Sequence, residues 1–166
     1  MAPPKIKTLQ ARFGFADTDL KKPLHDEIIK WLDANIQDIL MMLFSLQSRP
    51  KDAPTKWEPL VRMNEDGGQF IGFVDLMARF NPAPNVKGVW VDHSHVLFEA
   101  KTSIESLGEL FRQLRMYQAG YLSGYPVSQM PFVVVCPDET NAEIIREQEF
   151  RFLKYDPGMP FPAGAV

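Results

Sequence analysis

Apolar residues recur at helical spacing in two long stretches of the chain. The first runs from Pro23 to about Gln47, and the residues of its apolar stripe are Leu24, Ile28, Trp31, Leu32, Ile36, Ile39, Leu43 and Leu46. The second follows Thr102 or Ser103, either of which can cap a helix, and its stripe consists of Leu107, Leu110, Phe111, Leu114, Tyr117 and Tyr121. The pattern predicts two amphipathic helices, the first of which ends at Arg49-Pro50.

Shorter apolar and β-branched runs predict strands between and after these helices. The runs are residues 57–63, 69–80, 96–101, 132–136 and 150–155. The turn-forming segment Asn64–Gly68 joins the first two strands as a hairpin, and a third helix from about Asn141 to Gln148 connects the last two. The order helix, three-strand meander, helix, strand, helix, strand predicts an α/β fold, a mixed β-sheet flanked by helices.

The length of 166 residues fits one domain with a sizeable core. We expect a loosely held N-terminal arm at residues 1–22, one domain at residues 23–155 and a proline-rich disordered tail at residues 156–166. Hydrophobic residues make up 45% of the chain and charged residues 23%, so we expect neither global disorder nor a membrane protein. The longest apolar run, Ile39–Phe44, is too short to span a bilayer.

Two further features concern location and partners. The N-terminus lacks the apolar core of a secretory signal, and the single cysteine, Cys136, has no partner for an internal disulfide. Both predict a cytoplasmic protein. The net charge of −3 argues against a protein that coats nucleic acid nonspecifically, because that role favours a strongly basic surface. A nucleic-acid enzyme stays compatible with this charge, since a local groove and bound cations supply positive charge where it is needed.

The candidate chemistry lies near the ends of two predicted strands, at Asp75 and at Glu99-Ala100-Lys101. Side chains two apart share one face of a strand, so Glu99 and Lys101 point the same way, and Asp75 joins them if its strand pairs alongside. Two adjacent carboxylates repel each other unless a cation lies between them, and oxygen ligands with room for water suit Mg²⁺ or Mn²⁺ rather than Zn²⁺. Such a metal activates water for phosphodiester hydrolysis, while a lysine offsets the developing charge. The alternative is that Asp75 only forms a salt bridge, with Arg79 or Lys101, and binds no metal.

The order Gly72-x-x-Asp75, Glu99-x-Lys101 and Gln113-x-x-x-Tyr117 resembles the PD-(D/E)xK nuclease superfamily, and within it the RecB-like branch with a QxxxY motif. The resemblance covers roughly residues 23–155. It implies a restriction-endonuclease-like fold, metal ligation by Asp75, Glu99 and the Ala100 carbonyl, and a catalytic role for Lys101. This chain departs from the family name in one position, since Val74 stands where the name has proline.

The resemblance also implies supporting residues. Relatives place an acidic residue from a first helix beside the metal, which gives this role to Glu27; a solvated acid at the helix N-terminus is the alternative. Gln113 and Tyr117 lie four apart on one flank of a helix, from which an amide and a phenol reach a backbone phosphate or a metal-bound water. The alternative is a surface glutamine and an ordinary core tyrosine.

The chain has three histidines. We expect His25 to pack in or near the core more readily than to bind a metal, although some relatives use an early histidine as an extra ligand. His93 and His95 lie in a polar run that is typical of a turn, and two histidines without a third protein ligand do not make a zinc centre. A flexible loop over residues 81–95 beside the cleft is a hypothesis for substrate contact.

Together these features predict a Mg²⁺-dependent nuclease that hydrolyses phosphodiester bonds in DNA. Its predicted catalytic and supporting residues are Asp75, Glu99, Lys101, Glu27, Gln113 and Tyr117. Two alternatives stay open: an RNA-directed nuclease, and a catalytically silent subunit of the same fold that binds nucleic acid or assembles with other proteins. Nucleases of this size often pair to cut two strands, so a homodimer is a further hypothesis, and no membrane partner is expected.

Overall fold

The structure is a computed structural model that describes residues 22–80, 94–158 and 161. The predicted N-terminal arm, apart from Lys22, and His93 lie outside the described residues, as does most of the predicted tail. The boundaries expected for the domain stay a prediction. Within the described ranges, no helix is both long and apolar enough to cross a membrane.

The first predicted helix is two helices, α2 (Pro23–Ala34) and α3 (Ile36–Leu43). Pro23 occupies the first turn of α2 and Asp26 lies near its positive N-terminal end, as expected. The break falls at Asn35, whose side-chain amide donates to the Trp31 carbonyl over 2.8 Å. Asparagine competes for backbone hydrogen bonds in this way, so the prediction of one continuous helix to about Gln47 is wrong.

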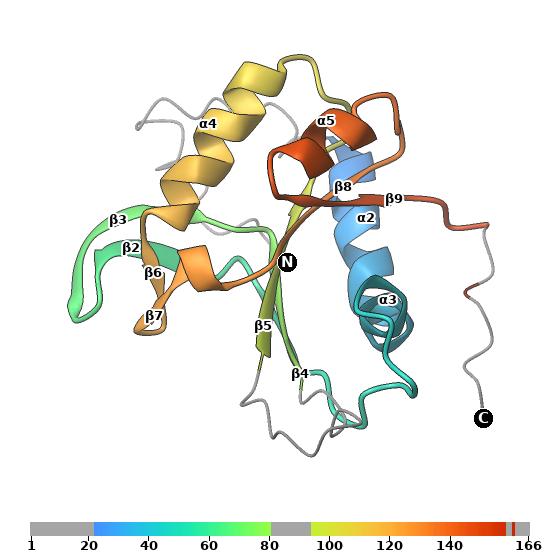
Figure 1. The fold of residues 1–166 in the computed structure, drawn as a ribbon, viewed down its shortest axis with the longest axis horizontal. Helices are drawn as coiled ribbons and strands as arrows, with labels where there is room; N and C mark the ends of the chain where they lie inside the picture. Colours follow the sequence, from blue (N-terminus) through green and yellow to red (C-terminus); the bar gives the residue numbers. More distant parts are fainter. Residues whose placement is uncertain (1–21, 81–93, 159–160, 162–166) are drawn as a thin grey trace.

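A five-stranded mixed sheet forms the centre of the molecule, with strand order β1-β4-β5-β8-β9 (Figure 1). Its strands are β1 (Thr55–Trp57), β4 (Leu76–Phe80), β5 (Ser94–Ala100), β8 (Phe132–Cys136) and β9 (Arg151–Lys154). β1, β4 and β5 pair antiparallel, whereas β5, β8 and β9 pair parallel. The parallel pairs require crossover helices, which are α4 (Leu107–Gln118) and α5 (Ala142–Glu147).

A second, antiparallel sheet lies beside the first, with strand order β3-β2-β6-β7. It consists of β2 (Leu60–Asn64), β3 (Gly67–Phe73) and the short strands β6 (Tyr121–Leu122) and β7 (Tyr125–Pro126), which are followed by a 3-10 turn, Val127–Gln129. The sequence predicted only a link at β6 and β7. It also predicted one continuous strand at each of two places where the chain passes from one sheet to the other. These places are Glu58-Pro59, between β1 and β2, and Val74-Asp75, between β3 and β4.

These two corners hold each other in place. The Glu58 N–H donates to the Asp75 carbonyl over 3.0 Å, and the Val74 N–H donates to the Pro59 carbonyl over 3.2 Å. Glu58 has a φ of 52°, a conformation that ends a regular strand. The hairpin therefore bends as a unit from one sheet into the other, and Asp75 lies at the bend.

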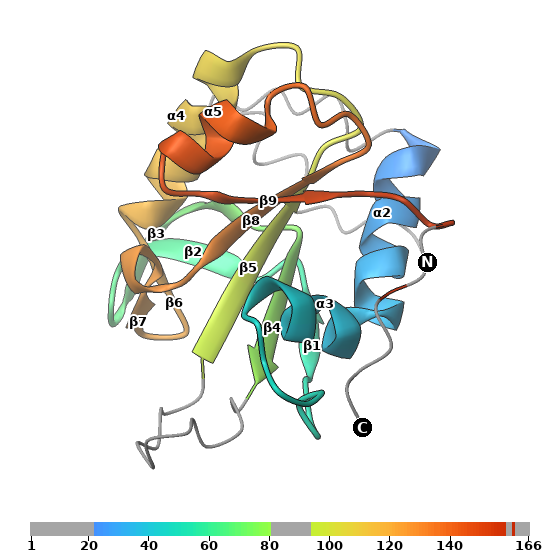
Figure 2. The ribbon, with the colours of Figure 1, turned by 45° about the vertical axis from the view of Figure 1, so that its right-hand side comes forward.

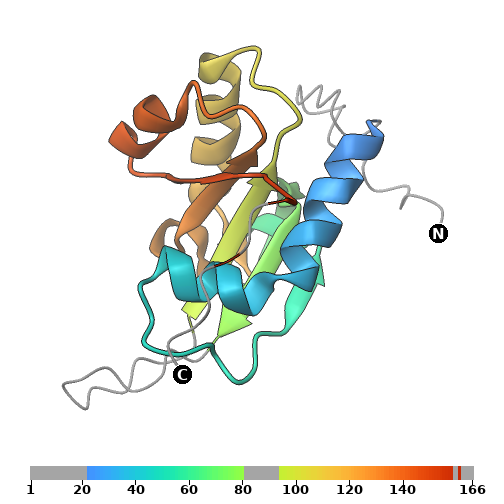
Figure 3. The ribbon, with the colours of Figure 1, turned by 90° about the vertical axis from the view of Figure 1, so that its right-hand side faces the viewer.

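Helices cover both faces of the central sheet, so the prediction of a mixed sheet flanked by helices is confirmed. α2 and α3 lie on one face, and α4 and α5 lie on the other (Figure 2). Figure 3 shows the molecule with α2 and α3 toward the viewer. Adjacent residues of β5 point to opposite faces, so Phe98 packs in the core under α2 and α3 and Leu97 packs in the core under α4.

The start of α4 differs from the prediction. Ser106, not Thr102 or Ser103, is its N-cap, and the Ser106 Oγ accepts a hydrogen bond from the Glu109 N–H over 3.3 Å. The extra residues between β5 and α4 carry the chain across the end of the sheet. α4 then returns over β5 with Gln113 and Tyr117 on its buried side.

Candidate functional site

The predicted acidic residues lie near one end of the pair β4 and β5. Leu76 lies opposite Phe98 in the antiparallel register, and Asp75, directly before β4, accepts a hydrogen bond from the N–H of Ala100, the neighbour of Glu99. Asp75 and Glu99 are 4% and 1% exposed, and Lys101, which follows β5, is 8% exposed. The three residues are buried at the same end of β5, and their role as one metal-binding or catalytic site stays a prediction.

Asp75 is held from two directions. Its Oδ2 accepts a hydrogen bond of 2.8 Å from the Ala100 N–H, and its Oδ1 lies 3.2 Å from Nε2 of the fully buried His25 on α2. The His25 contact has the distance of an ion pair but not the alignment of a good hydrogen bond. Burial opposes ionisation of Asp75, but His25, Lys101 and the Ala100 N–H together hold its pKa below the ordinary value of 3.8.

Glu99, Lys101 and Gln113 form a closed network. The Lys101 Nζ lies 3.1 Å from Glu99 Oε1 and donates over 3.1 Å to Gln113 Oε1. The Gln113 Nε2 donates over 2.8 Å to the same Glu99 oxygen. Each of the three side chains therefore contacts the other two, which fixes the orientation of all three in a buried place.

Tyr117 anchors this network to the bend before β4. The Gln113 Nε2 donates to the Tyr117 hydroxyl over 3.1 Å, and the hydroxyl donates to the Phe73 carbonyl over 2.9 Å. Tyr117 is fully buried, and its ring stacks on that of Phe132 with centroids 6.1 Å apart. Tyr117 is therefore a core aromatic, as the alternative reading expected, whereas the surface glutamine of that reading is wrong because Gln113 is buried. The expected contact of both residues with a phosphate or a metal-bound water stays a prediction.

The backbone geometry leaves the Ala100 carbonyl directed toward Asp75. The N–H groups of Leu97 and Lys101 donate to β8, so by alternation the polar backbone groups of Ala100 point to the β4 side. Had β4 begun two residues earlier, Val74 would donate to this carbonyl, but the Val74 N–H donates to Pro59 instead. Val74 therefore does not supply a ladder hydrogen bond to the Ala100 carbonyl.

Of the two α2 residues considered from the sequence, His25 lies against Asp75, whereas Glu27 is exposed. Glu27 is exposed and lies two residues from His25, about 200° away around a helix. Burial and, to a smaller extent, the nearby charge of Glu27 raise the pKa of the Tyr155 hydroxyl. Glu27 therefore lies on the side of α2 that faces Tyr155. The signal in the sequence was the spacing of His25 from Ile28, Ile29 and Leu32, which places the imidazole on the buried face.

The donor set fits a hard cation better than zinc. At this end of β5 the Asp75 carboxylate contacts His25 and the Ala100 N–H, and the Glu99 carboxylate contacts Lys101 and Gln113. Mg²⁺ typically takes one or two carboxylates and keeps several waters. Among residues 22–80 and 94–158, no three His, Cys, Asp and Glu side chains are grouped so that they could hold a metal ion by themselves. Both carboxylates also have basic neighbours in the protein, His25 beside Asp75 and Lys101 beside Glu99.

Comparison of the chain with protein-family models, with curated proteins and with solved structures found no match. The resemblance to PD-(D/E)xK nucleases therefore depends on residues alone. Those residues are Asp75, Glu99, Lys101, Gln113 and Tyr117, in the order and spacing of the motif. Membership of that superfamily stays a prediction.

Proposed function

We propose that this protein is a metal-dependent nuclease that hydrolyses phosphodiester bonds in DNA. The observation that carries the proposal is the burial of Asp75, Glu99, Lys101 and Gln113 together at one end of β5. Burying ionisable groups costs free energy, and the side chains most often kept buried in spite of that cost are those used in catalysis or ligand binding. A packed core without such a function would be expected to use apolar residues here.

The arrangement of elements supports a restriction-endonuclease-like fold as part of this proposal. The carboxylates come from the antiparallel pair β4 and β5, and the glutamine and tyrosine come from the helix that connects the parallel strands β5 and β8. In support of this fold, Asp75 accepts a hydrogen bond from Ala100, 25 residues away in sequence, and Glu99 accepts one from Gln113, 14 residues away.

In the proposed reaction, Asp75, Glu99 and the Ala100 carbonyl would hold Mg²⁺ or Mn²⁺. When bound, such an ion supplies Lewis acidity and lowers the pKa of a water molecule. The Lys101 ammonium, fixed by Glu99 and Gln113, places positive charge where the phosphoryl oxygens become more negative in the transition state. Gln113 and Tyr117 act as positioning residues, and His25 orients Asp75.

The test is cleavage of plasmid, linear duplex, single-stranded DNA and RNA in the presence of Mg²⁺, Mn²⁺ or EDTA. We expect the wild type to cut DNA only with a metal, and Asp75→Asn, Glu99→Gln and Lys101→Met each to lower the rate by about 10²-fold or more, because each removes a charge from the site. Tyr117→Phe should lower it less, since it removes only a positioning hydrogen bond.

The control variants Asp66→Asn and Lys154→Met make the same charge changes at residues outside the cluster, Asp66 in an exposed turn and Lys154 in a surface pair with Glu139. Cleavage that is equal in the wild type and in all three cluster variants would show that these residues do not form the active site. Cleavage of RNA but not DNA would assign the RNA-directed alternative.

One observation favours a second candidate, a silent nucleic-acid-binding or assembly subunit. Each carboxylate contacts a basic side chain of the protein, Asp75 the imidazole of His25 and Glu99 the ammonium of Lys101, so the cluster can be stable without a metal ion. This candidate predicts that no substrate is cut with any metal.

The homodimer expected for cutting two strands stays a prediction. Sedimentation of the protein alone and with DNA tests it.

A further inference from the structure

A second polar feature lies at the other end of β4 and β5. It is a cavity of about 390 Å³ between the central sheet and the β6–β7 hairpin, and it is lined by Pro54, Thr55, Lys56, Met77, Arg79, His95, Ser123 and Tyr125. Arg79 lies directly opposite His95 in the strand register, and Lys56 lies opposite Met77. By strand alternation these four side chains share one face of the sheet, so they form the floor of the cavity.

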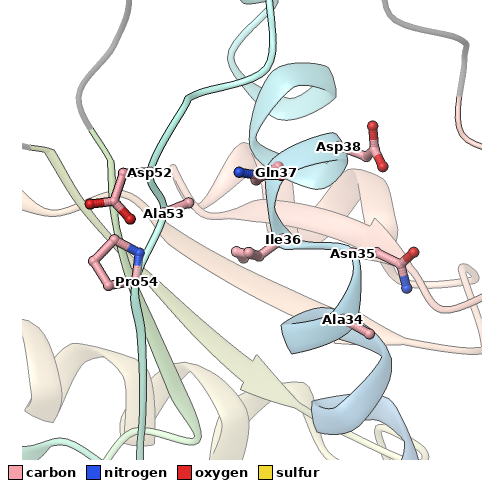
Figure 4. Close-up of a pocket in the computed structure, with 8 residues that line it drawn as sticks. All are labelled: Ala34, Asn35, Ile36, Gln37, Asp38, Asp52, Ala53 and Pro54. Atoms are coloured by element: carbon pink, nitrogen blue, oxygen red, sulfur yellow. The ribbon is translucent and has the colours of Figure 1, made fainter.

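The charge of this cavity differs from that of the whole chain. The chain has a net charge of −3, yet the eight lining residues include two cations, Lys56 and Arg79, one titratable imidazole, and no carboxylate. A second cavity of about 260 Å³, between the α2–α3 junction and the segment before β1, is lined by Asp38 and Asp52 and by no lysine or arginine (Figure 4). An anionic ligand therefore fits the first cavity and is disfavoured at the second.

The first cavity also presents aromatic surface. Tyr125 is 58% exposed, and its ring lies against that of His95, with centroids 5.4 Å apart and an angle of 33° between planes. An exposed tyrosine at the tip of a short hairpin contributes little to the core, but it offers a flat face to a planar ligand. Cationic side chains beside exposed aromatic rings are the combination with which proteins bind single-stranded nucleic acid, through its phosphates and its bases.

The cavity lies within reach of the proposed active site. Arg79 is four residues from Asp75 along the chain, and His95 is four residues from Glu99 in β5, which corresponds to about 13 Å along a strand. That separation equals roughly four nucleotides at the rise of a stacked strand. Met77 and Leu97 are buried between the two places, so a bound strand would pass along the exposed edge formed by β1.

We propose that the cavity floored by Lys56, Arg79 and His95 and bordered by Tyr125 binds single-stranded nucleic acid, with phosphates on the cations and a base on the tyrosine ring. In the proposed nuclease, this would be the part of the substrate strand that flanks the scissile bond. The position beside the scissile bond depends on the proposed function, whereas the binding of single-stranded nucleic acid does not.

The test measures binding in EDTA, so that no cleavage occurs. A fluorescently labelled single-stranded oligothymidylate of about 12 nucleotides is titrated with the full chain at several salt concentrations, and anisotropy is recorded. The variants are Lys56→Gln/Arg79→Gln and Tyr125→Ala. The matched control is Lys30→Gln/Arg146→Gln, which removes the same charge from exposed residues of α2 and α5. Circular dichroism confirms that each variant is folded.

We expect Lys56→Gln/Arg79→Gln to weaken binding by about tenfold or more and to reduce the slope of log K against log salt by about 1.4, the value for two phosphates of a single strand. Tyr125→Ala should weaken binding by about tenfold with the slope unchanged, because stacking does not release counterions. The control should bind within about twofold of the wild type, because Lys30 and Arg146 lie outside the cavity.

Two results would overturn the inference: equal binding by the cavity variants and the control, or binding of duplex DNA as tight as that of the single strand with no effect of Tyr125→Ala. Failure of the proposed function gives a different result. If the cavity variants lose binding while the wild type cuts no substrate with any metal, the strand-binding site stands and the nuclease proposal fails.

Discussion

At the scale of residues, Asp75 connects the backbone and the site. Its carboxylate accepts the hydrogen bond from Ala100 that a longer β4 would accept through its own backbone. The side chain thus completes the ladder at the point where the hairpin leaves the sheet. An apolar residue of similar size would leave the buried Ala100 N–H without an acceptor, which costs about 1–3 kcal/mol.

Stability should depend on the ionisation of Asp75. Because its pKa is lowered on folding, the ionised carboxylate contributes stability that is complete above the ordinary value of 3.8 and is lost as the pH falls through the lowered value. Asp75→Asn keeps an acceptor but leaves His25 and Lys101 without this counter-charge, so we expect a loss of about 3 kcal/mol at pH 5.

Urea unfolding of the wild type and Asp75→Asn between pH 2.5 and 6 measures this effect. The difference in unfolding free energy between the two proteins should shrink as the pH falls below about 3.8, because the wild-type carboxylate then becomes protonated and is uncharged, like the amide. A difference that stays constant down to the lowest pH would mean that folding does not lower the pKa of Asp75. Asp66→Asn, in an exposed turn, is the control.

Much of the site follows from short-range spacing. Glu99 and Lys101 are two apart in a strand, and Gln113 and Tyr117 are four apart on a helix, so each pair shares a face whatever surrounds it. The place of His25 beside Asp75 did not follow, because the two residues are brought together by the packing of α2 on the sheet. Local spacing shows which face of α2 is buried but not which residue lies beneath it.

At the scale of elements, the sheet corners and the junction after α4 position the site. The sequence analysis predicted continuous strands through Glu58 and Asp75. Pro59 was a signal against the first of these, because proline interrupts strand pairing, whereas no glycine or proline lies at Val74-Asp75. At the corners the hairpin changes its outside partner: its arm β4 pairs with β5 in the central sheet, and its arm β2 pairs with β6 in the second sheet. Pairing between distant segments outweighs local strand preference here.

Gly120 fixes the end of α4 against the second sheet. A Cβ at this position would lie 2.5 Å from Val61 Cγ1 and 2.7 Å from both the Arg62 carbonyl oxygen and Ile71 Cδ1. Because the backbone oxygen cannot move aside easily, we expect Gly120→Ala to lower the free energy of unfolding by about 1–3 kcal/mol. Thermal unfolding followed by circular dichroism measures this loss.

The control for this prediction is Gly108→Ala, in the first turns of the same helix. There the nearest atom to an added Cβ is the Ser106 Oγ at 3.9 Å, so the methyl group fits. Alanine favours helix over glycine, and Gly108→Ala should be neutral or stabilise by up to about 1 kcal/mol. If both variants lose the same stability, the close approach at Gly120 is not the cause.

At the scale of the whole molecule, two cores share one sheet. Leu97 belongs to the core under α4 and Phe98 to the core under α2 and α3, and both come from β5. Neither core can lose its packing without disturbing the strand that serves the other. We therefore expect the described part of the chain to unfold in one cooperative transition.

Leu97→Ala and Phe98→Ala test this cooperativity from the two faces. Each removes a fully buried side chain and should cost about 2–5 kcal/mol. Far-UV circular dichroism and tryptophan fluorescence should shift together in both variants, with the same midpoint in urea. Separate midpoints for the two probes, or a shift in one probe only, would show that the two cores unfold independently.

The sequence by itself determined the α/β class, most helices and strands of the central sheet, and the polar residues that gather at the end of β5. These follow from periodicity and spacing, which act over a few residues. The tertiary structure alone decided the split of the hairpin between two sheets, the choice of His25 over Glu27 and the second site around Arg79 and Tyr125. Those features depend on which distant segments pack together, and chain periodicity carries no information about distant partners.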